Sequence, residues 1–151
     1  KEIMGEEVTD SSMSKLVKNL NIEVVNLLKG CEVTSGIEKL KAKTKISTWM
    51  VASGGDEEEL RFLFKEKNIA SYFEGGIYGS PSSKYEIVEE RLKDKNFLPA
   101  LFLGDSLYDI QTAQKYNLDF IFVYGWTDLD DWKRICDKNQ LTYIEKIEDL
   151  I

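Results

Sequence analysis

The first third of the chain has the spacing of hydrophobic residues that is typical of an amphipathic helix. Apolar residues recur every three or four positions between about residues 9 and 28. They are Met13, Leu16, Val17, Leu20, Val24, Leu27 and Leu28. Gly30 follows this run and predicts where the helix ends. A second, short helix is expected up to about Lys43, because Ser35-Gly36-Ile37-Glu38 has the spacing of a capping box.

From residue 46 onward the pattern changes, and short apolar runs alternate with stretches of helical spacing. The runs predict strands at about residues 46–52, 73–78, 100–103, 120–124 and 142–144. Runs that are apolar at every position, such as 49–52 and 120–124, are typical of strands covered on both faces. The alternation predicts an α/β, doubly wound (Rossmann-like) parallel sheet with helices on both faces. We therefore expect a helical subdomain in residues 1–33 and an α/β core in residues 34–151.

The composition is ordinary for a soluble globular protein, with 42% hydrophobic and 31% charged residues among 151. The net charge is -7 and there is no basic run, which argues against a nucleic-acid partner. No apolar segment is long enough to span a bilayer, so no membrane partner is expected. The absence of histidine excludes a Ser-His-Asp triad and histidine-ligated zinc within this chain. Cys31 and Cys136 fit no metal spacing, and we interpret them as reduced thiols of a cytoplasmic protein.

Three polar residues are expected at the same edge of the predicted sheet. Ser53 and Asp105 follow predicted strands directly, and Lys84 begins the helix after the strand at 73–78. Ligands of an open parallel sheet bind at the carboxyl ends of its strands. The convergence of a hydroxyl, an ammonium and a carboxylate at this edge predicts a binding site there.

Asp105 and Asp109 are one helical turn apart, at the point where a strand passes into a helix. Mg²⁺ takes oxygen ligands, keeps several waters and commonly uses one or two protein carboxylates. The two aspartates are therefore candidate magnesium ligands. The alternative is structural, with Asp105 capping the helix and Asp109 completing its first turn.

Ser53, Gly54 and Lys84 are candidate phosphate-binding residues. Glycines let backbone amides approach a ligand, the following helix start offers unpaired N–H groups, and the serine hydroxyl adds a donor. Lysine is a compact cation suited to a phosphate oxygen or to a buried carboxylate. The structural alternatives are an ordinary strand-to-helix turn and a solvated lysine. The glutamates at 57–59 also make the local field less favourable for phosphate.

The segment Asp128-Leu129-Asp130-Asp131 holds the one D-x-D pattern of the sequence. Such a pattern can mark a nucleophile and its acid partner. Here Thr127 is a suitable helix cap, with Asp130 three residues on, and residues 125–127 separate the pattern from the strand end. We therefore interpret it as a helix start.

Three segments, in this order, resemble motifs two, three and four of the haloacid dehalogenase-like (HAD) superfamily. They are Val51-Ala52-Ser53-Gly54-Gly55, Gly79-Ser80-Pro81-Ser82-Ser83-Lys84 and Leu103-Gly104-Asp105-Ser106-Leu107-Tyr108-Asp109. The phosphoglycolate phosphatase and β-phosphoglucomutase-like group is the most similar. Residues 1–33, which begin Lys1-Glu2-Ile3-Met4-Gly5, resemble part of the helical cap of that group.

The resemblance implies a Mg²⁺-dependent phosphoric monoester hydrolase that acts on a small phosphorylated metabolite. Ser53 and Gly54 would bind the transferring phosphoryl group, and Lys84 would neutralise the phosphate and the nucleophile. Asp105 would hold Mg²⁺, and Asp109 would support that site directly or through another ligand. The family's nucleophile is the first aspartate of a D-x-D-x-T motif, which forms a phospho-aspartate that is then hydrolysed.

The 151 residues lack this first motif. In the family, the strand that carries it is central, between the strands that end here at Ser53 and Asp105. We therefore expect a gap in the sheet, with unpaired backbone groups on two apolar strands. We also expect further residues before Lys1 in the full-length protein, which would be active where this segment alone is not.

Three other functions fit the same residues. A phosphomutase of the same group uses the same motifs. A HAD-like binding protein without motif one would bind phosphate without catalysis. A receiver-like module could bind Mg²⁺ for regulation, although the long helical N-terminal segment argues against it. The Gly104-Asp105 pair argues against a true dehalogenase, because that branch of the family works without a metal.

Overall fold

The structure is a computed structural model that describes residues 2–3, 6–7, 10–94 and 97–151. Lys1, Met4 and Gly5 of the predicted cap segment, and residue 9 at the predicted helix start, lie outside the described residues. The chain divides into two compact units, Lys1–Glu32 and Val33–Ile151. None of the described helices is long and apolar enough to cross a membrane.

The elements are named in chain order, with η marking a 3-10 helix. They are β1 (Glu2–Ile3), β2 (Glu6–Glu7), α1 (Asp10–Gly30), α2 (Ile37–Lys43), β3 (Val51–Asp56), α3 (Glu57–Glu66), η1 (Ala70–Tyr72), β4 (Ile77–Ser80), α4 (Lys84–Leu92), β5 (Leu101–Gly104), α5 (Leu107–Tyr116), β6 (Asp119–Val123), η3 (Tyr124–Trp126), α6 (Trp132–Asn139), β7 (Thr142–Ile144) and η4 (Ile147–Leu150).

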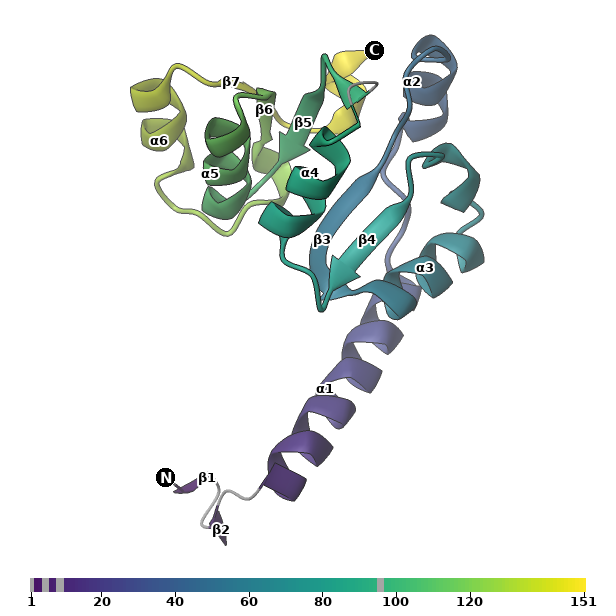
Figure 1. Cartoon of the computed structure of the whole chain (residues 1–151), viewed down its shortest axis with the longest axis vertical. Helices are drawn as coiled ribbons and strands as arrows, with labels where there is room; N and C mark the ends of the chain where they lie inside the picture. The colour runs from purple at the N-terminus through teal and green to yellow at the C-terminus, as the bar shows by residue number, and fades with distance from the viewer. Residues whose placement is uncertain (1, 4–5, 8–9, 95–96) are drawn as a thin grey trace. The chain divides into compact units, whose positions relative to one another are not determined.

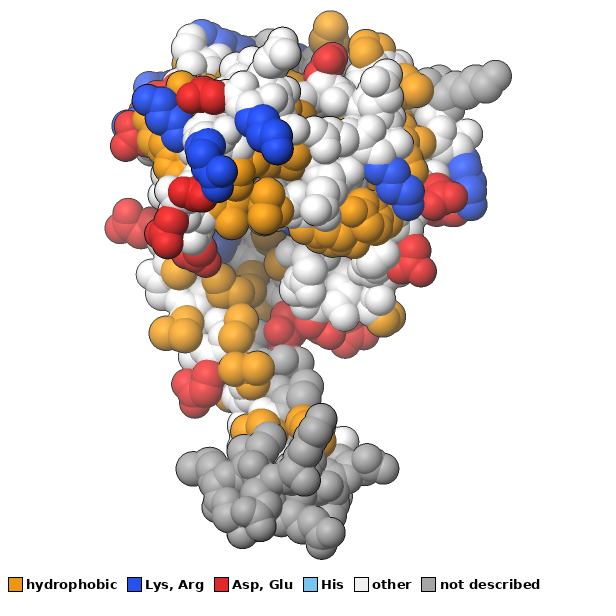
Figure 2. Space-filling model, turned by 90° about the vertical axis from the view of Figure 1, so that its left-hand side faces the viewer, with side chains coloured by type: hydrophobic (Ala, Val, Ile, Leu, Met, Phe, Trp, Pro, Cys, Tyr) orange, Lys and Arg blue, Asp and Glu red, His pale blue; other side chains and the backbone are white. Residues whose placement is uncertain are grey.

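The first unit consists of α1 and an antiparallel pair of two-residue strands, β1 and β2. The apolar spacing predicted helix from about residue 9 to 28, with Asn19 and Asn21 leaving two shorter helices possible, and the structure has a single helix of 21 residues that ends at Gly30. The strand pair was not predicted, because two residues are too few to show a period. Several apolar side chains of α1 are exposed, including Leu20 at 60% and Leu27 at 72%, and Figure 2 shows apolar surface along this helix.

The second unit contains two parallel sheets instead of one continuous sheet. β3 pairs with β4, while β5, β6 and β7 form a three-stranded sheet in that order. In Figure 1 the strands follow the order β7, β6, β5, β3, β4 across the view. The described residues place no strand between β3 and β5, so the sheet is interrupted at the predicted position.

Helices connect the two sheets and cover both faces. α4 contacts β3, β4 and α5, and α5 in turn contacts β5 and β6. The two sheets extend in opposite directions from the interruption (Figure 1). Because parallel crossovers are right-handed, α3 and the pair α5 and α6 belong on opposite faces. The predicted α/β fold, with parallel strands and helices on both faces, is confirmed.

The core of the three-stranded sheet is built on β6. Ile110, Phe122 and Cys136 come from α5, β6 and α6 and form one buried cluster. Trp132 stacks on Tyr124 beside it, with ring centroids 4.3 Å apart. Burying a large apolar side chain stabilises the fold by about 1.5–3 kcal/mol. This packing fixes the end of β6 and the segment that follows it.

Several local predictions were wrong, and the strand predicted at 73–78 is found only at Ile77–Ser80. The strand predicted at 46–52 begins at Val51 and continues to Asp56, while Trp49, which precedes it, donates its indole N–H to Thr44 Oγ1. Ser35 does not cap α2: its hydroxyl donates to Glu148, 113 residues away, and Gly36 occupies the cap position. The helix predicted from about Asp128 begins at Trp132.

Candidate functional site

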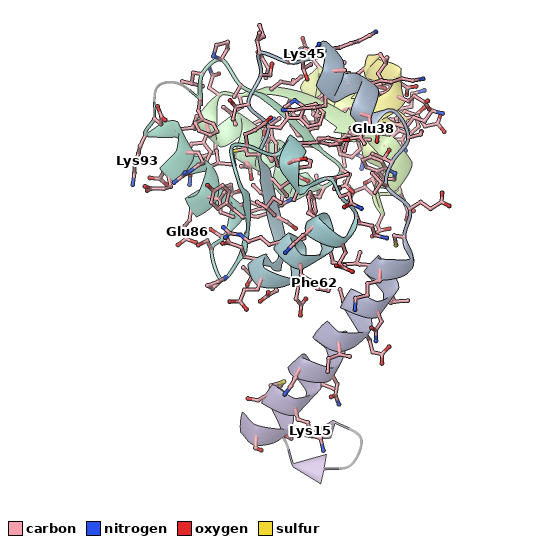
Figure 3. The ribbon with its side chains drawn as sticks, turned by 90° about the vertical axis from the view of Figure 1, so that its right-hand side faces the viewer. Lys15, Glu38, Lys45, Phe62, Glu86 and Lys93 are labelled. Atoms are coloured by element: carbon pink, nitrogen blue, oxygen red, sulfur yellow. The ribbon has the colours of Figure 1, made fainter. Side chains whose placement is uncertain are left out.

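The site is organised by the starts of α4 and α5, which follow β4 and β5. Ser83 caps α4 by accepting a hydrogen bond from the Glu86 amide, and the Glu86 carboxylate accepts one from the Ser83 amide. Figure 3 shows Glu86 at this end of α4 and Lys93 at the other. The capping box fixes Lys84 as the first residue of the helix.

Lys84 forms an ion pair with Asp109, the third residue of α5. The Nζ–Oδ1 distance is 2.5 Å, and the two side chains are only 16% and 2% exposed. This pair joins a helix packed on β3 and β4 to a helix packed on β5 and β6. The alternative of a solvated lysine is therefore wrong. An ammonium group has three donors, so Lys84 keeps donors for a ligand after pairing with Asp109.

Asp109 uses its second oxygen to hold the turn after β5. Oδ2 accepts hydrogen bonds from the Ser106 hydroxyl at 2.6 Å, the Ser106 amide at 3.2 Å and the Asp105 amide at 3.3 Å. The Asp109 amide donates back to Ser106 Oγ, which completes a capping box. Both oxygens of Asp109 are thus engaged by groups of the protein. This geometry places Asp109 as the residue that positions Lys84 and the turn.

Asp105 is not the cap of α5, because Ser106 takes that role. The structural alternative for Asp105 is therefore wrong, and its carboxylate lies at the end of β5 partly exposed. Burial raises the pKa of the Asp105 carboxyl above its ordinary value, and the negative charges of Asp109 and Asp128 raise it further. Lys84 opposes this shift. A cation at this position would relieve the repulsion between the carboxylates.

Ser53, Gly54 and Gly55 are the third to fifth of the six residues of β3, and they do not form a turn after it. The Gly55 amide donates to Ser53 Oγ at 3.1 Å, which leaves the hydroxyl proton free to donate to a ligand. Both glycines are exposed. Glu57 accepts a hydrogen bond from the Gly79 amide and pairs with Arg61, so its charge is compensated. The electrostatic repulsion of an anion is therefore weaker here than the three consecutive glutamates indicated.

Asp128 is the residue that the sequence interpretation missed. It was assigned to a helix start, but it lies in the exposed loop between β6 and α6, and its charge acts on the Asp105 carboxyl. The available signal was its position shortly after a strand that ends at the same edge as β5. The other two acids of the segment, Asp130 and Asp131, precede α6, and Asp131 pairs with Arg134.

The donor set at this edge fits Mg²⁺ only in part. Among the described residues, no group of three or more His, Cys, Asp or Glu side chains could hold a metal ion. Mg²⁺ commonly binds through one or two carboxylates and completes its shell with water and substrate phosphate. Asp105 fits that role, because it is partly exposed and its negative form is disfavoured without a cation. Asp109 fits it less well, because both of its oxygens already accept hydrogen bonds.

Replacing Asp105 with asparagine is expected to stabilise the protein at pH 7. A carboxyl whose pKa is raised by folding contributes stability below its unfolded pKa and loses it as the pH rises through the folded pKa. The charged form at pH 7 is therefore the destabilised one, and the advantage of Asp105→Asn should shrink as the pH falls to about 4. Urea denaturation at the two pH values measures this difference.

With Mg²⁺ present at pH 7, the wild type should become more stable to urea than Asp105→Asn. A ligand at one hundred times its dissociation constant stabilises by about 2.7 kcal/mol, and only the carboxylate form of residue 105 offers Mg²⁺ a charged ligand. An equal response of the wild type and Asp105→Asn to Mg²⁺ would remove Asp105 from the metal site.

Comparisons with solved structures identify the fold. The chain aligns with a haloacid dehalogenase-like family hydrolase from Streptococcus pneumoniae at a TM-score of 0.69 and 18% identity, over 91% of this chain and 67% of that one. A protein from Clostridium difficile named as a candidate phosphatase aligns at 0.72 and 18% identity, over 95% and 70%. A HAD-superfamily hydrolase from Ehrlichia chaffeensis aligns at 0.60 and 22% identity, over 99% and 78%. No protein-family model and no curated protein sequence matches the chain.

Proposed function

We propose that this chain, which has the haloacid dehalogenase-like fold, forms the phosphate- and metal-binding part of a Mg²⁺-dependent phosphatase for small phosphorylated metabolites. The observation that carries the proposal is the placement of Ser53, Lys84 and Asp105. Ser53 follows the regularly paired residues of β3, Lys84 begins the helix after β4, and Asp105 directly follows β5. Parallel strands of one α/β unit end at one rim, which is where ligands of such folds bind.

Each of these residues has a distinct task. Ser53 donates its hydroxyl proton to a phosphoryl oxygen, and the exposed Gly54 supplies a backbone amide beside it. Lys84, held by Asp109, offsets negative charge on the phosphoryl group during transfer. Asp105 would hold Mg²⁺, which supplies electrostatic stabilisation of the transferring group. The chain thus contributes hydrogen-bond donors for the phosphoryl group and one carboxylate for the cation.

We infer a position for the nucleophile from the interruption of the sheet. β3 and β5 both present an unpaired edge, and a strand between them would end between Ser53 and Asp105. We infer that this strand carries an aspartate that attacks phosphorus while the ester P–O bond breaks and the leaving alcohol takes a proton from a second acid. Water then attacks phosphorus of the aspartyl-phosphate, returns a proton to that acid and releases orthophosphate.

A phosphate-binding protein without catalysis is the second candidate function. It is favoured by the same interruption, because the described residues supply binding groups but no strand in the nucleophile position. Binding of orthophosphate is common to both functions. Product analysis separates them, and it also separates a hydrolase from a mutase, because one forms orthophosphate and the other an isomerised sugar phosphate.

Replacing Lys84 with methionine is expected to weaken orthophosphate binding by about tenfold or more. A hydrogen bond to a charged group contributes about 1.5–3 kcal/mol, and about 1.4 kcal/mol corresponds to a factor of ten. Isothermal titration calorimetry with orthophosphate in Mg²⁺ buffer measures the change.

Lys41→Met is a matched control for this experiment. Lys41 also pairs with an acid, Glu74, at 2.7 Å, and its side chain is 15% exposed, but it lies on α2, which precedes the start of β3. Its removal should leave phosphate affinity unchanged. Equal losses in the two variants, or no binding of millimolar orthophosphate by the wild type, would contradict a phosphate site at Lys84.

A further inference from the structure

A half-exposed tryptophan follows the strand that pairs with β5. Trp126 ends η3, which directly follows β6. Gly104 of β5 is in register with Phe122 of β6, so the two strands end side by side and Trp126 follows four residues after Phe122. Asp128, two residues further on, is close enough for its charge to act on Asp105. The loop that carries Trp126 therefore belongs to the same rim.

The indole of Trp126 differs from those of Trp49 and Trp132 in its contacts. It is 50% exposed, and within the described residues it makes no hydrogen bond or ring contact. Trp49 donates to Thr44 and packs on Phe73, and Trp132 stacks on Tyr124. The exposed half of this large apolar side chain is surface that a ligand could bury with a gain in free energy.

The backbone around Trp126 is held in place. The Gly125 amide donates to Glu145 O at 3.0 Å, the Thr127 amide to Tyr124 O at 3.4 Å and the Leu129 amide to Thr127 Oγ1 at 3.2 Å. The loop is thus anchored on the segment after β7 and on its own turn. An aromatic ring on an anchored loop can bind a ligand with little loss of conformational entropy.

The charges of the rim limit what the rest of the ligand can be. Asp128 is exposed near Asp105, and Glu58 is exposed at the start of α3. A second anionic group on the substrate would meet these carboxylates and be repelled. Leu107 begins α5, two residues after Asp105, and its aliphatic side chain is 42% exposed.

We propose that Trp126 and Leu107 form an apolar wall that binds the leaving group of the substrate, which is a phosphate monoester of an uncharged alcohol with an aromatic or other flat apolar face. The proposal rests on the proposed phosphate site and specifies the part of the substrate that this site does not touch. It disfavours substrates such as phosphoglycolate, whose leaving group carries a carboxylate.

Phenylphosphonate and methylphosphonate test the wall without any catalytic step, because their P–C bonds are not hydrolysed. Isothermal titration calorimetry in Mg²⁺ buffer should show that the wild type binds phenylphosphonate about tenfold more tightly, as expected for stacking on one aromatic ring. Trp126→Ala should abolish this preference and leave methylphosphonate affinity unchanged. Trp126→Phe should retain most of it.

Phe62→Ala is the control, because Phe62 is another exposed aromatic residue, 45% exposed on α3 (Figure 3), and its loss should not change the preference. If the wild type binds neither phosphonate, the proposed phosphate site fails and the wall with it. If both phosphonates bind equally, or if Trp126→Ala keeps the preference, the wall is overturned while the phosphate site stands. Loss of the preference in Phe62→Ala as well would also overturn the assignment to Trp126.

Discussion

Replacing Asp109 with alanine is expected to lower the free energy of unfolding by about 3–5 kcal/mol, the range observed when one partner of a buried ion pair is removed. The carboxylate is 2% exposed and accepts hydrogen bonds from Lys84 Nζ, from the Ser106 hydroxyl and amide and from the Asp105 amide. Its loss leaves an ammonium and several donors without an acceptor in a place that water reaches poorly. Urea denaturation followed by circular dichroism measures the difference.

Asp56→Ala is the matched control for this substitution. Asp56 is an aspartate at the start of a neighbouring helix, and its carboxylate accepts one hydrogen bond from the Glu59 amide. Removing such a cap costs about 1 kcal/mol. A loss in Asp109→Ala no larger than in Asp56→Ala would show that the ion pair with Lys84 contributes little, and it would remove the argument that Asp109 positions that lysine.

The fold class was predictable because it depends on the period of the hydrophobic pattern. α1 and the strand–helix alternation after residue 46 follow directly from that period. Strand boundaries were less predictable, since β3 begins only at Val51. Trp49 has the side chain of a buried strand residue, but Thr44 and Phe73 provide it with a hydrogen bond and a ring contact outside the sheet.

Helix caps could be predicted where the partners are close in sequence, but not where the partner is distant. Ser106 and Asp109 have the spacing of a capping box, so the cap of α5 could have been assigned from the sequence and Asp105 released for a functional role. Ser35 and Glu38 have an equivalent spacing, but the serine hydroxyl finds Glu148 near the other end of the chain. A local pattern cannot show a partner that only tertiary packing supplies.

The positions of polar residues near strand ends could be predicted from the sequence. The ion pair and the loop that link these residues could not. Lys84 begins α4 and Asp105 directly follows β5, whereas Ser53 lies inside β3, three residues before its last residue. The ion pair between Lys84 and Asp109 spans two separate sheets and could not be derived from spacing. Asp128 was missed because the loop before α6 is longer than predicted, which places its carboxylate near Asp105 instead of in a first helical turn.

Replacing Gly104 with alanine is expected to destabilise the protein strongly, although it adds only a single methyl group. A Cβ at this position would lie 2.5 Å from Asp109 Cγ and 2.8 Å from Asp109 Oδ2, both far inside van der Waals contact. Because Asp109 is held by Lys84 and Ser106, it cannot move without breaking those bonds. Overpacking typically costs about 1–3 kcal/mol and sometimes more, and the displaced ion pair places this variant at the upper end.

The same substitution should weaken orthophosphate binding, because Lys84 loses the partner that positions it. Gly54→Ala is the control for stability, since a Cβ there would have nothing within 4 Å, and its free energy of unfolding should stay within about 0.5 kcal/mol of the wild type. Urea denaturation and phosphate titration of both variants measure the two effects. If Gly104→Ala unfolds at the same urea concentration as Gly54→Ala, Asp109 is free to move, and the glycine before Asp105 is not required by packing. If it loses stability but binds phosphate normally, Lys84 does not depend on Asp109 for its position, and the two must be assigned separate roles.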